Sequence, residues 1–298
     1  MEILNKLKSE ENLAIALGFF DGIHLGHKAV IMSAVDYAKK HNIKSAVVTF
    51  RQSPYVAINN VKPNYIMTLE EKIRTIKKIG VDYLYLLDFT EDLAKQTASD
   101  YLKNLVDNLH PKMIVTGFNH YFGYNKSGGV DYLRLMQDEY GYEFKEVSPI
   151  KLQNGIISSS EIRKALSEGN IQKANAMLGY RFYVKNEVIK GRQIGRKIGF
   201  KTANLKMPEK MLNLPDGVYA VEIEVFGKKH MGIANFGSNP TITDDTQKFL
   251  EVHIIDFNED IYGQIVKVNF LTKIRDEKKF QSLAELKTQI KKDIECLE

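Results

Sequence analysis

The chain has 298 residues, of which 44% are hydrophobic and 27% are charged, so it is long enough for two domains with separate cores. Its formal charge of +5 comes from 42 basic and 37 acidic residues without a block of like charge, which argues against a nucleic-acid-binding arm. A single cysteine excludes an internal disulfide, and no apolar run approaches the roughly 18 residues that span a membrane, so we expect a cytoplasmic protein.

The first half alternates apolar runs with amphipathic segments. We expect strands at 13–17, 45–50, 83–87 and 113–116, and helices at 28–39 and 69–79. Thr68 and Glu71 form a capping box at the start of the second helix, and residues 51–67 are expected to form a loop because prolines and asparagines cluster there. This alternation predicts a parallel sheet with covering helices, in which the loops after the strands build the site.

The segment Gly18–His27 joins the first strand to the first helix. A loop in that position places backbone N–H groups and the positive helix end where an anion would sit, and Gly26 would let a ligand lie against the helix. His24 and His27 are three residues apart, so both imidazoles can face one ligand and offset charge that builds on phosphates during nucleotidyl transfer. By itself such a pair is more often a surface feature. A zinc site is disfavoured because Cys296 is distant and no third ligand is spaced nearby.

The segment Ile157–Arg163 carries hydroxyl groups at an expected helix start. Helix N–H groups, serine hydroxyls and Arg163 would together hold a triphosphate. Ser158 with Glu161 is also a capping box, so a purely structural role stays open.

The segment Gly117–Gly123 leaves the expected strand at 113–116. Aromatic residues in a loop usually serve packing, but this loop starts at the expected edge of the site.

After Gly179 the pattern changes to short β-rich runs, at 184–189, 218–225, 231–234, 250–255 and 265–270. They predict a β-barrel or sandwich rather than a second parallel sheet. A capping box at Ser282 and Glu285, followed by an apolar stripe, predicts a terminal helix. A glycine-rich, basic loop at 191–204 follows the first of these runs, although glycine-spaced loops are often plain turns.

These motifs resemble two enzyme modules. Gly18–His27 reads G-x-F-D-G-x-H-x-G-H, and with 117–123 and 157–163 it resembles the prokaryotic FAD synthetase branch of the nucleotidyltransferase superfamily. The loop at 191–204 and the segments at 217–220, 235–241 and 250–253 resemble the riboflavin kinase module in the same order. The resemblance covers essentially the whole chain. It implies an α/β fold: a Rossmann-like nucleotidyltransferase domain with a parallel sheet over 1–179, then a β-barrel riboflavin kinase domain with a terminal helix over 180–298.

For the first domain the resemblance implies transfer of AMP from ATP to FMN, giving FAD and pyrophosphate. The implied catalytic residues are His24, His27 and Arg163. The implied ATP-binding residues are Gly18, Phe19, Phe20, Asp21, Gly22, Gly26, Ser158, Ser159 and Ser160. The implied flavin and ATP pocket includes Asn119 and Phe122.

For the second domain it implies phosphorylation of riboflavin by ATP. Glu251 would accept the proton of the ribityl hydroxyl as that oxygen attacks the γ-phosphate, and Thr202 would meet Mg²⁺. The implied ATP and flavin contacts are Gly195, Arg196, Asn204 and Arg275. Small-molecule substrates are then the expected partners, without nucleic acid or membrane, and a homo-oligomer is compatible with the sequence.

The chain departs from the family pattern at four places. Lys201 stands where proline is usual, Asn239 replaces an arginine, His120 replaces a phenylalanine, and 49–54 lacks the usual histidine between two prolines. Proline would fix φ beside Thr202, so Lys201 suggests a slower kinase. This departure leaves open a monofunctional FAD synthetase with an impaired kinase domain. The basic net charge, with the kinship of the resembled superfamily to class I aminoacyl-tRNA synthetases, leaves open a second alternative, a non-catalytic flavin- or RNA-binding regulator.

Overall fold

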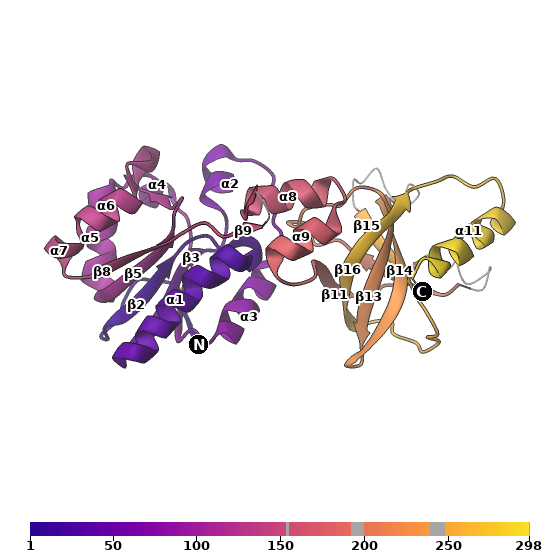
Figure 1. The fold of residues 1–298 in the computed structure, drawn as a ribbon, viewed down its shortest axis with the longest axis horizontal. Helices are drawn as coiled ribbons and strands as arrows, with labels where there is room; N and C mark the ends of the chain where they lie inside the picture. The colour runs from indigo at the N-terminus through magenta and orange to yellow at the C-terminus, as the bar shows by residue number, and fades with distance from the viewer. Residues whose placement is uncertain (153–154, 192–199, 239–247, 298) are drawn as a thin grey trace. The chain divides into compact units, whose positions relative to one another are not determined.

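The computed structural model describes residues 1–152, 155–191, 200–238 and 248–297. The chain forms two compact units, Met1–Ser159 and Ser160–Glu298, which are described separately (Figure 1). Among the described residues, no helix is both long enough and apolar enough to cross a bilayer.

The first unit is built on a six-stranded sheet in the order β1-β4-β3-β2-β5-β8, and every pairing in it is parallel. The strands are β1 (Glu2–Leu4), β2 (Leu13–Leu17), β3 (Lys44–Phe50), β4 (Tyr83–Leu87), β5 (Pro111–Gly117) and β8 (Glu143–Val147). All five residues of β2 are buried, which explains why its sequence is continuously apolar. The parallel sheet confirms the fold class expected from the sequence.

Helices cover this sheet. They are α1 (Leu25–His41), α2 (Pro54–Asn59), α3 (Leu69–Ile79), α4 (Glu91–Lys95), α5 (Ala98–Leu109), α6 (Val130–Leu135) and α7 (Gln137–Tyr140). α1 packs across β2, β3 and β5, and α5 buries Leu102 and Leu105 against the sheet face that carries Leu13 and Ile15. Strand residues alternate between the two faces, so one strand contributes to both cores.

Two details of the first unit differ from the sequence expectations, and one agrees. The helix at 69–79 is confirmed, and the Thr68 hydroxyl accepts from the Glu71 amide at 3.3 Å. The segment 51–67 was expected to be a loop throughout, which is wrong because α2 lies within it. α2 begins with Pro54, a residue suited to a first helical turn, and buries no side chain, so it leaves no apolar period in the sequence. α1 also begins earlier than expected, at Leu25.

The order of the strands indicates where a ligand is expected to bind. From β2 the chain passes to β3 and β4 on one side, then returns to β5 and β8 on the other. The direction therefore reverses between β2 and β5. Ligands of open parallel sheets bind outside the carboxyl ends of the strands at such a reversal. The loops that leave β2 and β5 begin at Gly18 and Phe118, the two segments already singled out.

The second unit is an antiparallel barrel in the order β11-β16-β13-β14-β15-β12. Its strands are β11 (Tyr183–Glu187), β12 (Thr202–Lys206), β13 (Gly217–Val225), β14 (Lys228–Ser238), β15 (Lys248–Ile254) and β16 (Ile265–Asp276). An antiparallel bridge between Ile189 and Asn204 joins the two ends of the sheet, so the barrel is nearly closed. This confirms the expected barrel, although β12 had not been recognised as a strand.

Among the described residues of the second unit, the helices are α8 (Ser159–Ser167, which begins one residue before the unit), α9 (Ile171–Leu178) and α11 (Leu283–Glu295). α11 is the expected terminal helix. The Ser282 hydroxyl accepts from the Glu285 amide at 3.2 Å, and the Glu285 carboxylate accepts from the Gln281 amide at 3.0 Å. The expected apolar stripe is only half-buried, because Leu283 is 54% exposed.

Candidate functional sites

The two histidines of the first loop lie together. His24 is the N-cap of α1, and its ring Nδ1 accepts from the His27 amide at 3.3 Å. The two imidazoles stack with 3.6 Å between ring centres. Because Nδ1 accepts a hydrogen bond, the proton of a neutral His24 ring sits on Nε2. The stacking of His24 and His27 agrees with the prediction that both imidazoles lie on the same side of one turn.

The glycine next to this pair has a different use from the one expected. A Cβ on Gly26 would lie 3.1 Å from Cε1 and 3.2 Å from Nδ1 of His24. The imidazole of His24, rather than a ligand, therefore occupies the space that Gly26 leaves.

The backbone between β2 and α1 is strained. Phe20, Gly22 and Ile23 have φ angles of 56°, 77° and 35°. Glycine adopts such angles readily, but for Phe20 and Ile23 each costs on the order of 1–3 kcal/mol and persists only where the surroundings hold it. This loop is therefore a structure that its neighbours must enforce.

Asp21 and Ser159 supply part of that enforcement. The Asp21 side chain is 4% exposed, and its two oxygens accept from the Ile66 amide at 3.0 and 3.2 Å. Ser159 Oγ donates to the Asp21 carbonyl at 3.0 Å. The carboxylate of Asp21 thus fixes the loop, and the Ser159 hydroxyl contacts the same loop.

A buried lysine that the sequence reading missed supplies the rest. Lys72 on α3 is 4% exposed, and its Nζ donates to the carbonyl oxygens of Phe19 and Phe50 at 3.0 and 2.9 Å. Lysine is rarely buried without partners. A weak sequence signal existed, because Lys72 follows Glu71 on the face of α3 that also carries Ile76, and all three residues are buried.

The predicted residues of the loop after β5 differ in their exposure to solvent. Asn119 is exposed, whereas Phe122 is 9% exposed and packs on Tyr101 with 5.3 Å between ring centres. Phe122 therefore serves the core. The Nε2 of His120 is buried without a hydrogen-bond partner, and burial lowers the pKa of His120 to about 4, so the ring is neutral at physiological pH.

The remaining predicted residues of the first site divide between the two units. Ser158 precedes α8 and belongs to the first unit. Ser160 and Arg163 lie on the part of α8 that belongs to the second unit, and their approach to His24 stays a prediction.

In the second unit a row of polar residues crosses three strands. Glu251 on β15 pairs with Asn204 on β12 and with Asn235 on β14. Directly paired residues point to the same face of a sheet, and the alternate positions Leu250 and Val252 are fully buried in the barrel core. The sheet register therefore brings together Asn204 and Glu251, both of which the resemblance implied.

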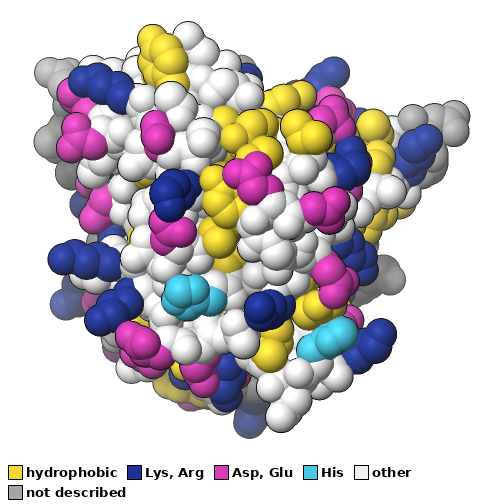
Figure 2. Space-filling model, turned by 90° about the vertical axis from the view of Figure 1, so that its left-hand side faces the viewer, with side chains coloured by type: hydrophobic (Ala, Val, Ile, Leu, Met, Phe, Trp, Pro, Cys, Tyr) yellow, Lys and Arg dark blue, Asp and Glu magenta, His cyan; other side chains and the backbone are white. Residues whose placement is uncertain are grey.

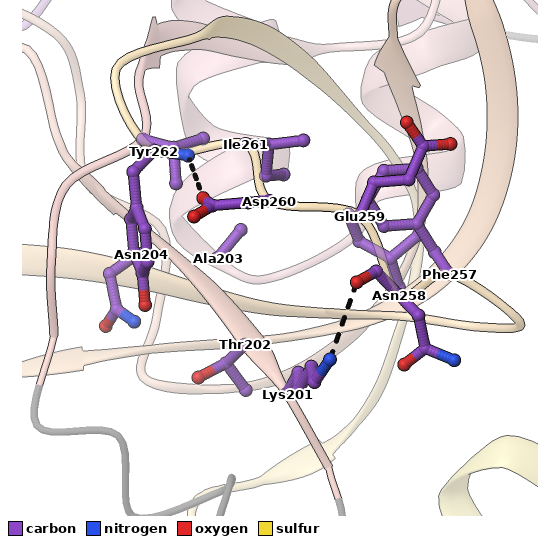
Figure 3. Close-up of a pocket in the computed structure, with 12 residues that line it drawn as sticks. Lys201, Thr202, Ala203, Asn204, Phe257, Asn258, Glu259, Asp260, Ile261 and Tyr262 are labelled. Carbon is purple, nitrogen blue, oxygen red and sulfur yellow. Dashed lines mark hydrogen bonds between the residues drawn. The ribbon is translucent and has the colours of Figure 1, made fainter.

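A pocket of about 140 Å³ lies beside this row (Figure 3). Thr202 and Asn204 line it together with the segment Phe257–Tyr262, whereas Glu251 does not. The sequence reading missed that segment, although its Asn-Glu-Asp run shortly after a β-rich run was a visible signal of a polar loop. Gly195 and Arg196, which were expected here, lie outside the described residues, as does Asn239.

Lys201 is held at both ends. His253 Nδ1 lies 2.9 Å from its carbonyl oxygen, and Lys201 Nζ donates to the Asn258 carbonyl at 3.4 Å across the pocket (Figure 3). The sequence suggested that losing proline frees this backbone. The contact with His253 restrains it in another way.

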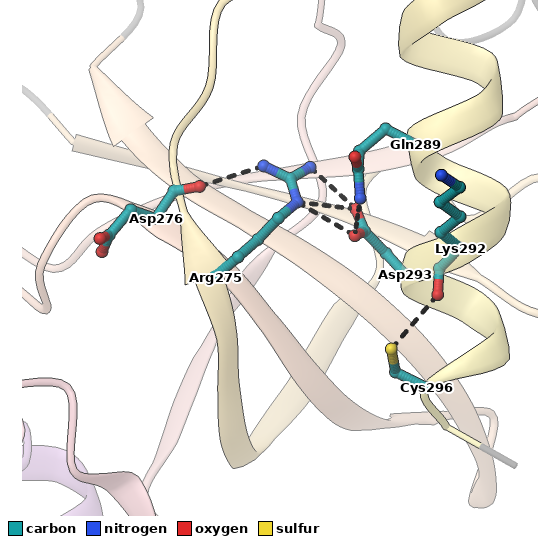
Figure 4. Close-up of polar contacts among 6 residues, drawn as sticks. All are labelled: Arg275, Asp276, Gln289, Lys292, Asp293 and Cys296. Carbon is teal, nitrogen blue, oxygen red and sulfur yellow. Dashed lines mark hydrogen bonds and ion pairs between the residues drawn. The ribbon is translucent and has the colours of Figure 1, made fainter.

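Arg275 faces the terminal helix. Its Nε and Nη2 donate to the two oxygens of Asp293 at 3.0 and 2.8 Å, and Gln289 also donates to Asp293 (Figure 4). Asp293 is 2% exposed, so this is a buried, bidentate ion pair. Arg275 thus ties β16 to α11, and a flavin contact by the same guanidinium stays a prediction.

No large field of one sign appears on the face drawn in Figure 2, where basic and acidic side chains are interspersed around a narrow hydrophobic band. Among the described residues, no group of three or more histidine, cysteine, aspartate or glutamate side chains is arranged to hold a metal ion. The first observation gives no support to nucleic-acid binding by that face.

Comparison with known proteins assigns each half to a family. Residues 6–161 match the family described as FAD synthetase, and residues 178–298 match the family described as riboflavin kinase. A bifunctional riboflavin kinase/FMN adenylyltransferase of Listeria monocytogenes is 37% identical over 95% of this chain and 90% of its own length. The Escherichia coli K12 protein of that name is 34% identical over 95% and 91%. A solved structure from Streptococcus pneumoniae, described as a macrolide-efflux protein, is 35% identical, covers 99% of this chain and 97% of its own, and has a TM-score of 0.89.

Proposed function

Because the chain belongs to the bifunctional riboflavin kinase/FMN adenylyltransferase family, we propose that its two units carry the two reactions at the two sites described above. The protein is a transferase of FAD biosynthesis, with a nucleotidyltransferase domain and a kinase domain. The single observation that supports the placement of the first site best is that the His24 and His27 loop leaves β2 at the strand reversal.

In the proposed adenylyl transfer, a phosphate oxygen of FMN attacks the α-phosphorus of ATP and pyrophosphate leaves. His24 Nε2 and the His27 ring donate to the phosphate oxygens, which favours the charge of the transition state. Backbone N–H groups at the start of α1 and α8 bind the remaining oxygens, with Ser158, Ser159, Ser160 and Arg163. This direct transfer needs no covalent enzyme intermediate.

In the proposed kinase reaction, Glu251 orients the ribityl hydroxyl of riboflavin and accepts its proton as the oxygen attacks the γ-phosphorus of ATP. Asn204 lies opposite Glu251 in the sheet, and the pocket beside it would take part of the nucleotide. Positioning and charge neutralisation supply most of the rate in phosphoryl transfer.

Mg²⁺ is part of this proposal. The donors beside the pocket are oxygen atoms, of Thr202 and of the carboxylates Glu259 and Asp260, and oxygen is what Mg²⁺ prefers. Mg²⁺ usually keeps water and binds substrate phosphates through one or two protein ligands, so a dedicated cluster is not required. Thr202 would hold the ion, which neutralises phosphate charge when bound.

Product analysis tests the proposal. Purified protein is incubated with ATP and Mg²⁺, separately with riboflavin and with FMN, and the flavins are separated by chromatography. We expect FAD in both reactions, with FMN as an intermediate in the first. FAD from FMN alone would support the monofunctional alternative, and the absence of both products would support a non-catalytic regulator.

Two smaller expectations accompany the function. A cytoplasmic location is proposed, because ATP and flavins are available there, and cell fractionation would test it. Homo-oligomer formation is a separate proposal that light scattering of the purified chain would test.

A further inference from the structure

Lys72 lies outside every motif discussed above, yet it contacts the loop that follows β2 and the end of the neighbouring strand β3. Its Nζ donates to the Phe19 carbonyl, directly before the strained residues of the first loop, and to the Phe50 carbonyl at the end of β3. Its third partner is Thr49 Oγ1 at 3.4 Å, and that hydroxyl donates to the Phe19 carbonyl at 3.0 Å. An ammonium group has three hydrogens, so these three acceptors match its full capacity.

The segment that leads into α3 makes a second contact with the loop. Asp21, two residues after Phe19, holds the Ile66 amide in the segment that enters α3. The Asp21 charge also acts on Lys72 and favours the ammonium form. The strained turn between Phe20 and Ile23 is therefore fixed from both sides by α3 and its entry, although α3 carries none of the predicted site residues.

Burying the charge of Lys72 lowers the stability of the fold. A functional role for this charge would explain why a lysine occupies the position. Lys72 is 4% exposed, and burial lowers its pKa to about 8 despite the opposing effect of Asp21. A neutral side chain of similar length would avoid this cost. The ammonium also covers the Phe19 ring, 4.2 Å from its centre, which excludes water from one side.

We infer that Lys72 is a positioning residue for adenylyl transfer: its buried ammonium holds the loop that carries His24 and His27 and adds positive charge behind the edge where nucleotide phosphates would bind. The peptide unit whose carbonyl accepts from Lys72 is the one that bears the Phe20 N–H, so the bond also polarises a donor of the loop. This inference rests on the proposed function.

The first test compares Lys72→Met with Lys78→Met, which removes an exposed lysine of the same helix. We expect Lys72→Met to lower kcat/KM for ATP in FAD formation from FMN by about 30-fold or more, whereas Lys78→Met stays within about twofold. Riboflavin phosphorylation, assigned to the other unit, serves as an internal control and should stay within about twofold in both variants. A Lys72→Met protein that is folded and within about threefold of wild type would overturn the inference.

The second test is the pH profile. Other charges near Lys72 are engaged: Glu71 pairs with Arg74 at 3.6 Å on α3, and Arg51 after β3 pairs with Asp88 at 3.3 Å. We expect wild-type kcat/KM for ATP to fall as pH rises through about 8, because the ammonium loses its proton, and we expect that limb to be absent in Lys72→Met. If Lys72 is purely structural, the fall in kcat/KM above about pH 8 should persist in Lys72→Met. That result would overturn the inference.

Lys72→Gln covers the case in which Lys72→Met fails to fold, because it keeps a hydrogen-bond donor without the charge. It should show the same loss in FAD formation and the same missing limb, and wild-type behaviour in this variant would overturn the inference. A wild-type protein that makes no FAD from FMN contradicts the proposed function instead. The two failures are thus distinguishable.

Discussion

The two proposed sites, each assigned to a nucleoside triphosphate, are built in different ways. The first site is a strained loop after a fully buried strand, held from behind by the buried side chains of Asp21 and Lys72. The second is a row of polar side chains across barrel strands. It lies beside a pocket in which Lys201 Nζ donates to the carbonyl of the exposed residue Asn258. Changes behind the first site should therefore affect geometry and stability together, whereas changes around the second should affect activity with little loss of stability.

The largest effect is expected at the first loop. His24→Ala removes a phosphate donor and the side-chain cap of α1, so we expect FAD formation from FMN to fall by about 10³-fold. Riboflavin phosphorylation should be unchanged, and His41→Ala, at the exposed end of the same helix, is the matched control. Initial rates for both reactions provide the measurement. Equal losses in both reactions would contradict the separation of the two sites.

The next effect tests whether the second unit contains a stabilising buried charge of its own. Asp293→Ala leaves the Arg275 guanidinium without its bidentate partner, and we expect the free energy of unfolding of that unit to fall by about 3 kcal/mol. Asp276→Ala removes the ion pair between Asp276 and Lys273, in which the Asp276 side chain is 88% exposed. This change should lower the free energy of unfolding much less. Urea unfolding of both variants gives the difference. Similar losses would show that burial does not distinguish the two pairs.

A third change addresses the polar row alone. Glu251→Gln keeps the shape of the side chain but removes the proton acceptor, so riboflavin phosphorylation should fall by about 10²-fold while FAD formation from FMN continues. The melting temperature should stay close to that of wild type. Glu209→Gln, at an exposed position of the same unit, is the control. Full kinase activity in Glu251→Gln would assign the base to another residue.

The smallest effect is expected at Lys201. Lys201→Pro restores the residue usual in the kinase module, but His253 already restrains the Lys201 carbonyl. We therefore expect the rate of riboflavin phosphorylation to change by less than about tenfold, which is about 1.4 kcal/mol in the barrier. A gain far above tenfold would show that the lysine impairs the kinase, as the monofunctional alternative requires.

The sequence was sufficient for the framework of both units because local patterns report burial. The fully apolar run at 13–17 and the stripe at 69–79 gave a strand and a helix with the bounds observed. α2 was missed because it buries no side chain, and β12 was missed because its first three residues fall within the glycine-rich segment 191–204. Periodicity reports which face is buried, so an element without a buried face, or one masked by loop composition, leaves no period.

Site residues were predictable where a motif is continuous in sequence and less so where the partner is distant. The His24 and His27 pair was visible because both residues lie in one turn. The roles of Lys72 and Asp293 depend on contacts with residues that are 53 and 18 positions away along the chain. The resemblance implied a ligand-pocket role for Phe122, which stays a prediction; the structure adds that its ring is buried against Tyr101, a contact that the residue type alone does not reveal.

The position of β2 in the middle of its sheet has a consequence for the order of assembly. Leu13 pairs with Lys44 on one side and with Pro111 on the other, and the second pairing closes a loop of about 100 residues, which is slow. In the barrel, β13 and β14 form a hairpin joined by a tight turn at Phe226 and Gly227. During synthesis the first loop therefore becomes fixed only after β5 has emerged, although the loop is translated well before that strand. Pulse-labelled hydrogen exchange should show protection of the β13–β14 hairpin before protection of β2.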